Sequence, residues 1–178
     1  SDAQLAEEFV AQDGISLLLT LAHDERVVGG GGELGAATLV ALRQALRFQA
    51  ALDQLADSEE HSMLLCRLLY SASDMVASRA LELLILVCGA ASKPDVHQRV
   101  LAAATASACE LDEPPLRVLV CHLRSDTYDL RLNALTFINA LVATAATRHD
   151  RDVVVFSLDR LGANGALLRM VDDDDAKL

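Results

Sequence analysis

A short leucine-rich pattern recurs four times along the chain at nearly regular intervals. Two adjacent apolar residues, two spacers and a third apolar residue form the pattern, which begins at Leu17, Leu64, Leu119 and Leu167. These starts lie 47, 55 and 48 residues apart. After the first three comes a longer apolar segment with an Ala-Leu pair, at Ala41-Leu42, Ala80-Leu81 and Ala134-Leu135. Such self-similarity is typical of repeats that bury their apolar faces against one another.

The spacing of apolar residues predicts helices almost throughout the chain. Long segments with an i, i+3, i+4, i+7 pattern begin near Leu34, at Asp74 and after Asp126. The best candidate strand, residues 152–156, continues into Leu158 and Leu161 at helical spacing. Aromatic residues make up only 3% and tryptophan is absent, which favours closely packed helices over a β-sandwich. We therefore expect an all-α fold, an armadillo/HEAT-like right-handed solenoid of about three to four repeats.

The glycines of residues 27–35 offer an alternative interpretation. Gly30, Gly32 and Gly35 have the spacing G-x-G-x-x-G, and Asp53 follows eighteen residues later. A dinucleotide-binding loop requires a strand before the first glycine, and the sequence predicts none there. The first repeat is longer by about eight residues, so we expect the Gly29–Gly32 run to lengthen a turn in which no side chain has to pack. An enzyme or ligand carrier on a helical fold is the second hypothesis, and only this run favours it.

Charge and hydropathy narrow the classes of partner. The net charge of −11 argues against nucleic acid and favours basic partners. The uninterrupted apolar runs are too short to span a membrane, so direct membrane insertion is not expected. We expect residues 1–171 to form one armadillo-repeat domain of a larger protein. We expect residues 172–178 to form an acidic tail that is disordered or not native.

No pattern in the sequence predicts an enzyme, a metal site or a cofactor. The cysteines stand singly in apolar segments, so they are expected to be buried and reduced, as in the cytoplasm: Cys66, Cys88, Cys109 and Cys121. The histidines are dispersed, which favours surface or capping roles over metal ligation: His23, His61, His97, His122 and His149. The adjacent Cys121 and His122 would point about 100° apart on a helix, which disfavours a catalytic pair.

Binding residues are expected on the third, long helix of each repeat, because these helices line the inner surface of such a solenoid. The candidate positions are Arg43 and Arg47 on the first long helix, Arg79, Ala80, Glu82 and Leu83 on the second, and Asn133 and Thr136 on the third. The small Ala80 followed by Leu83 suits a peptide-binding groove that admits an amphipathic helix.

Five segments in order resemble the armadillo-repeat inhibitory domain of diaphanous-related formins, also called the FH3 region, including its FHOD-like members. They are EEFVAQDGISLLLTLA (residues 7–22), LVALRQALRFQAALDQL (39–55), ASRALELLILVC (77–88), HQRVLAAATASACELDEPPLRVLVCHL (97–123) and LRLNALTFINALV (130–142). SLDRLGANGALLRM is similar to the closing segment of that family. The armadillo region of the engulfment and motility scaffold family is a second resemblance, carried by residues 13–18 and 138–141. The formin spacing fits without a gap through residues 100–119.

The formin resemblance implies autoinhibition of actin assembly by a cytoplasmic, cytoskeleton-associated protein. In such formins this domain holds an amphipathic, partly basic segment from the C-terminus of the same protein, and a Rho-family GTPase at an adjoining N-terminal module releases it. The groove positions that match are Arg43, Arg47, Ala80 and Leu83. Arg47-Phe48 stands where many members carry Asn-Asn, and the GTPase-binding module is expected to be absent or truncated before Ser1. The engulfment family would instead imply a scaffold for GTPase-driven cytoskeletal signalling.

Overall fold

The computed structural model describes residues 2–24, 32–90 and 95–175, with side chains described for residues 4, 8–24, 32–90 and 95–170. Every regular element in these ranges is an α-helix. The helices are α1 (Asp2–Ala11), α2 (Gly14–His23), α4 (Glu33–Ala45), α5 (Gln49–Asp57), α6 (Glu59–Leu68), α7 (Asp74–Ala90), α8 (Val96–Glu110), α9 (Arg117–His122), α10 (Tyr128–Thr144), α11 (Arg148–Arg160) and α12 (Ala163–Asp175). The all-α prediction is confirmed.

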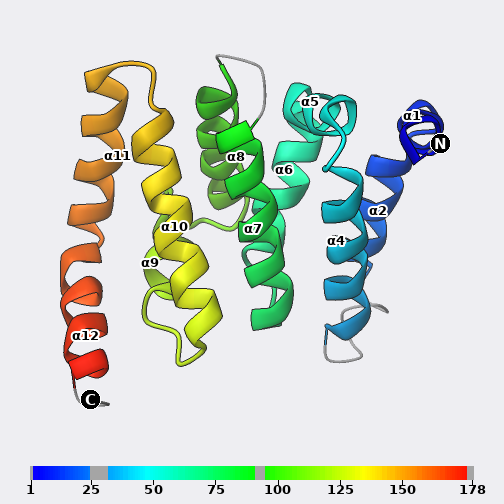
Figure 1. Ribbon diagram of the computed structural model, residues 1–178. Helices are drawn as coiled ribbons and strands as arrows, with labels where there is room; N and C mark the ends of the chain where they lie inside the picture. The colour runs from blue at the N-terminus through cyan, green and yellow to red at the C-terminus, as the bar shows by residue number, and fades with distance from the viewer. Residues whose placement is uncertain (1, 25–31, 91–94, 176–178) are drawn as a thin grey trace.

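The helices form a stack of repeated units, each ending in a long helix (Figure 1). The units are α1–α2–α4, α5–α6–α7 and α8–α9–α10, followed by the pair α11–α12. Successive long helices pack side by side, α4 against α7 and α7 against α10. The short helices pack behind them, since α2 contacts both α4 and α6. The recurring leucine pattern of the sequence therefore marks α2, α6, α9 and α12.

One continuous apolar core runs through the stack. Leu39 of α4, Leu84 of α7 and Phe137 of α10 are fully buried within it. Complete burial of such a side chain contributes about 1.5–3 kcal/mol relative to exposure. Because the core continues from one unit of the stack to the next, each unit is stabilised by burial against its neighbours.

Several helix boundaries differ from the predicted ones for local reasons. The apolar segment that continues past residue 45 is interrupted at Leu46–Phe48, where the chain turns into α5. Asp74, where the sequence places the start of the second long segment, lies in the first turn of α7, and its carboxylate accepts hydrogen bonds from the hydroxyls of Ser125 and Thr127. α12 runs to Asp175, so residues 172–175 of the expected tail continue the helix.

The cysteines differ in burial. Cys66 and Cys88 are buried as expected, whereas Cys109 and Cys121 are exposed. The prediction of four buried cysteines is therefore wrong for two of them. The positions fall near the C-terminal ends of α8 and α9, where the apolar period of a helix no longer fixes which side faces the core.

Three of the five histidines, for which surface or capping roles were predicted, join neighbouring units through hydrogen bonds. His23 Nε2 lies 2.7 Å from the carbonyl oxygen of Leu64, and His122 Nε2 lies 2.8 Å from that of Leu69. His61 Nε2 lies 2.7 Å from the hydroxyl of Ser16. Burial lowers the pKa of His23, His61 and His122, so the neutral rings are favoured in the folded state.

At position 32, the last of the glycine run, the structure requires a glycine. It precedes α4 with φ 78°, and a Cβ atom there would fall 2.2 Å from Ser73 Oγ. The expectation that no side chain packs against these glycines is therefore wrong at Gly32, because the turn before α7 packs directly onto it. The other three glycines of the run, including Gly30, lie outside the described residues. α2 precedes the run, so the described structure supplies no strand for a dinucleotide-binding unit.

Gly32→Ala is expected to lower the free energy of unfolding by about 2 kcal/mol or more, because the side chain meets both a left-handed backbone and Ser73. Urea denaturation measures this. Gly165→Ala is the matched control: its Cβ would meet nothing within 4 Å, and alanine favours the helix. Equal stability of the two variants would contradict the close approach at Gly32.

His122→Gln is expected to flatten the pH dependence of stability. Because the pKa of His122 is lowered in the folded state, the unfolded chain takes up the proton first, and stability falls as the pH drops below about 6.5. The glutamine amide keeps a donor for the carbonyl of Leu69 and takes up no proton. Urea midpoints between pH 7.5 and 5.5 test this, with exposed His149→Gln as control. An unchanged slope in His122→Gln would refute it.

Candidate functional site

The three long helices present a shared face made of one solvent-facing stripe from each helix. We define this three-helix face by Val40 and Arg43 of α4 with Arg47 of the turn that follows it, Met75, Arg79, Glu82 and Leu86 of α7, and Tyr128, Leu132, Asn133 and Thr136 of α10. Within each helix these residues recur mainly every three or four positions, which places them on one side. The face combines apolar, charged and uncharged polar side chains.

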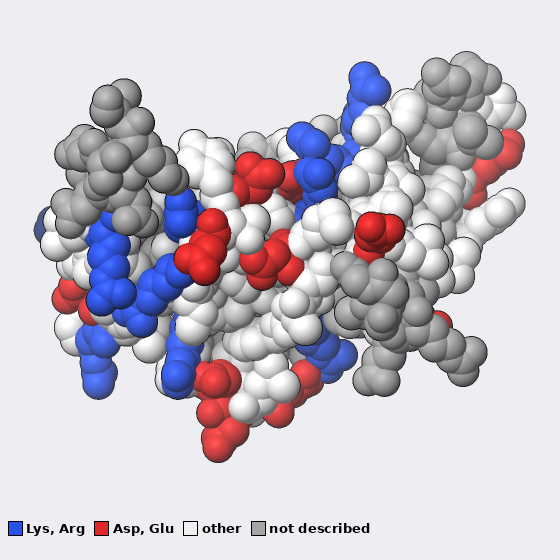
Figure 2. Space-filling model, turned by 90° about the horizontal axis from the view of Figure 1, so that it is seen from below, with Lys and Arg blue, Asp and Glu red and all other residues white. Residues whose placement is uncertain are grey.

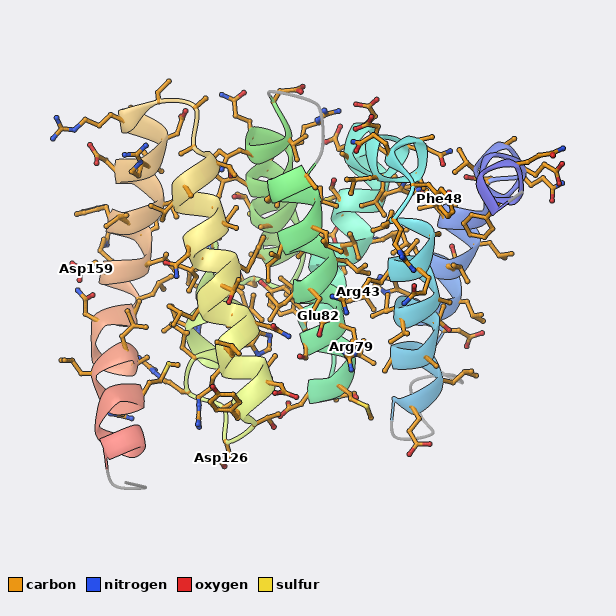
Figure 3. All side chains as sticks on the ribbon, viewed as in Figure 1. Arg43, Phe48, Arg79, Glu82, Asp126 and Asp159 are labelled. Atoms are coloured by element: carbon orange, nitrogen blue, oxygen red, sulfur yellow. The ribbon has the colours of Figure 1, made fainter. Side chains whose placement is uncertain are left out.

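Glu82 joins two arginines at the centre of the face. Its Oε1 lies 2.6 Å from Arg79 Nη1, and its Oε2 lies 3.3 Å from Arg43 Nη1. The carboxylate therefore links α7 to α4, and Figure 3 shows the three side chains between these helices. Only 19% of the Glu82 side chain is exposed, against 51% for Arg43 and 39% for Arg79. Much of each guanidinium group is left free to meet a partner.

Asn133 extends this network to α10. Its Nδ2 donates to the hydroxyl of Ser78 at 2.8 Å and lies 3.5 Å from Glu82 Oε1. Ser78 is buried, and sequence reasoning missed it because its role depends on a helix 55 residues away. Arg43, Arg79, Glu82 and Asn133 are thus brought together from three helices.

The face is locally positive although the chain is negative overall. Arg43, Arg47 and Arg79 are set against the single carboxylate of Glu82 at its centre. Arg47 is exposed at the turn that follows α4. At this surface, acidic groups of a partner would be attracted more strongly than basic groups. The net charge of the chain is therefore a poor guide to its partner here.

Ala80 and Leu83 do not belong to the face, and their assignment to it was wrong. Ala80 is completely buried and Leu83 is 1% exposed. α7 packs against α4, α5, α6, α8 and α10, so most of its circumference lies in the core. Thr136 is exposed as predicted, and its hydroxyl donates to the carbonyl of Leu132 one turn earlier.

The apolar members of the face were also missed by the sequence analysis. Val40 and Leu132 are 39% and 44% exposed, and Tyr128 at the start of α10 is 58% exposed. Val40 precedes Arg43 by three residues, so helical spacing alone could have identified it. These side chains give the face the apolar contacts that an amphipathic partner needs.

Chemically reactive groups are sparse in the part of the chain with described side chains. No group of three or more potential metal ligands is found there, and no described helix is long and apolar enough to cross a membrane. Burial raises the pKa of the Cys66 and Cys88 thiols to about 12, so both stay protonated and are poor nucleophiles. The Nε2 atom of His122 is already engaged with the carbonyl of Leu69, so this ring is not free to act as a base through that nitrogen.

The comparison with protein families decides between the two resemblances. Residues 33–166, more than half of the chain, match the family model described as the FHOD1/3 FH3 domain. The chain belongs to this family. No curated protein matches the chain significantly. The match extends from α4 into the start of α12, so the FH3 domain contains the whole three-helix face.

The FH3 family consists of non-catalytic, helical-repeat domains of formins, and membership of it suggests a formin regulatory domain. The formin interpretation of the sequence is thereby confirmed, and the engulfment and motility family is set aside. The matched region begins at Glu33, so the glycines before it lie outside the shared part of this FH3 domain.

Ala80→Asp is expected to destabilise this FH3 domain by roughly 3 kcal/mol or more, because it places a carboxylate in the core without a partner. The substitution is therefore unsuitable as a probe of binding. Ala102→Asp, on the exposed side of α8, makes the same chemical change in solvent and should cost a few tenths of a kcal/mol. Urea denaturation compares the two, and equal stability would mean that Ala80 is accessible.

Proposed function

We propose that the three-helix face binds an amphipathic autoregulatory segment from the C-terminus of the same formin and thereby inhibits actin assembly. The observation that carries the proposal is the partly exposed Arg43–Glu82–Arg79 group beside exposed apolar side chains on adjacent helices. Membership of the FH3 family supports a regulatory role.

The arrangement suits a helical segment lying across the long helices. Its apolar side would contact Val40, Leu132 and Tyr128, which lie on α4 and α10 on either side of α7. Its acidic side chains would pair with Arg43 and Arg79, whose charge exceeds that of Glu82. Basic residues of the segment would then lie away from the centre of the face, toward the acidic parts of the surface.

Release would follow when a Rho-family GTPase binds an adjoining N-terminal module and competes with the segment. The domain performs no reaction in this scheme and acts by holding or freeing its partner. We place the protein at the cytoskeleton in the cytoplasm, where its actin-assembling region would work.

Charge reversal on the face is expected to weaken binding of the C-terminal segment at least about tenfold, because the two lost attractions become repulsions. The variant is Arg43→Glu with Arg79→Glu, and fluorescence anisotropy with the labelled C-terminal segment measures the affinity. Arg148→Glu with Arg151→Glu makes the same change of charge on exposed residues of α11, away from the face, and is the control.

The full-length protein gives the second readout. The face variant should raise actin assembly in a pyrene-actin assay without any GTPase, and the α11 variant should remain inhibited. If the face variant keeps its fold in thermal melting and binds the segment as tightly as the unaltered chain, the segment does not bind at this face.

A further inference from the structure

A second charged site lies at the opposite end of the stack from α1, between the turn joining α9 to α10 and helix α12. A cavity of about 80 Å³ opens there, with Arg124, Arg131 and Arg169 among its lining residues. Leu123 and Ala166, both buried, are also among the lining residues and are apolar. Figure 2 shows basic side chains gathered at this end of the molecule. We call this cavity the arginine pocket.

Two of the arginines are positioned by backbone carbonyl groups. Arg124 Nη2 donates to the carbonyl of Gly162 at 3.3 Å, and Arg131 Nη1 donates to that of Ser125 at 3.0 Å. A guanidinium group carries five N–H donors, so each keeps several for another acceptor. Arg124 and Arg131 are therefore held at the pocket by contacts that leave their charge uncompensated, and Arg169 adds a third cation to its lining.

The three pocket arginines differ from six others in having no carboxylate partner among the described side chains, a property that they share with Arg47, Arg151 and Arg160. Arg43, Arg67, Arg79, Arg99, Arg117 and Arg148 each pair with a carboxylate. Among residues with described side chains, no carboxylate forms an ion pair with Arg124, Arg131 or Arg169. Asp126 lines the pocket, but Figure 3 shows it at the outer tip of the α9–α10 turn. The pocket thus offers positive charge to an anion from outside.

The size and donors of the pocket suit a tetrahedral phosphate. One water needs about 10–15 Å³ of such space, so 80 Å³ accommodates a group several times larger. Guanidinium groups donate paired hydrogen bonds to phosphate oxygens, and a phosphate monoester carries close to two negative charges at neutral pH. The apolar floor suits the short carbon stem of the residue that bears it.

We propose that the arginine pocket binds the phosphate group of a phosphorylated serine or threonine on a partner protein. A single phosphate on a side chain can enter a recessed cavity, whereas an anionic bilayer would meet the carboxylate of Asp126 first and would be repelled by a chain of net charge −11. The pocket is separate from the three-helix face, so this proposal stands independently of autoinhibition.

Nuclear magnetic resonance of arginine Nε–H groups in the 178-residue chain tests the proposal. N-acetyl-O-phosphoserine amide should shift the signals of the three pocket arginines saturably, and N-acetylserine amide should leave them unmoved. Arg131→Gln and Arg169→Gln should each weaken binding about tenfold, the loss expected for a hydrogen bond to a charged group. Arg148→Gln removes one positive charge from α11 and should leave the affinity unchanged.

Backbone spectra of each variant show whether the fold is kept. Arg169 forms no hydrogen bond or ion pair with another described side chain, so its replacement tests the pocket even if Arg131→Gln perturbs the α9–α10 turn. If Arg148→Gln weakens phosphoserine binding as much as the pocket variants do, the binding depends on overall charge alone and the proposal is overturned. Binding of inorganic phosphate without phosphoserine would also overturn it, as would Arg169-dependent binding to phosphatidylinositol-phosphate vesicles without phosphoserine binding.

Discussion

Burial of α7 between α4 and α10 is the contact on which the rest of this molecule depends. α7 is apolar over most of its circumference, and it also packs against α5, α6 and α8. Removed from these neighbours, its leucines would be exposed to water, and the free energy gained on burial would be lost. A single unit is therefore not expected to be stable alone, because the stability of repeat proteins depends on contacts between neighbouring repeats.

This same contact creates the three-helix face. When the long helices pack side by side, the few side chains that remain outside the core are brought within reach of one another. Glu82 can bridge to Arg43 only because α4 and α7 are adjacent, and Asn133 reaches Ser78 only because α10 lies on the other side. The polar network thus depends on core packing, because the helices that carry it are held side by side by their buried faces.

The helices themselves were largely predictable from the sequence, since each carries an apolar period and a recognisable boundary. The four leucine-rich patterns fall in α2, α6, α9 and α12, and the three Ala-Leu segments fall in α4, α7 and α10. The site was predictable only in part. Arg43, Arg79, Glu82 and Asn133 were identified because charged and amide groups avoid a core, whereas Ala80 and Leu83 were misplaced because apolar residues on a nearly all-apolar helix do not reveal which side faces solvent.

Distance along the chain explains the remaining errors. Gly32 meets Ser73, and His122 meets the carbonyl of Leu69, across separations that no local pattern encodes. The arginine pocket also depends on a distant contact, because Arg169 lies 38 residues beyond Arg131 in the chain and looks like an ordinary surface residue in the sequence.

The sequence by itself determined an all-α repeat and its formin family, because both follow from the spacing of the apolar residues and from their order along the chain. Only the tertiary structure decided which residues face outward and which charges converge. The reason is physical: helix periodicity follows from bonds a few residues apart, whereas exposure and ion pairing depend on neighbours brought together by packing.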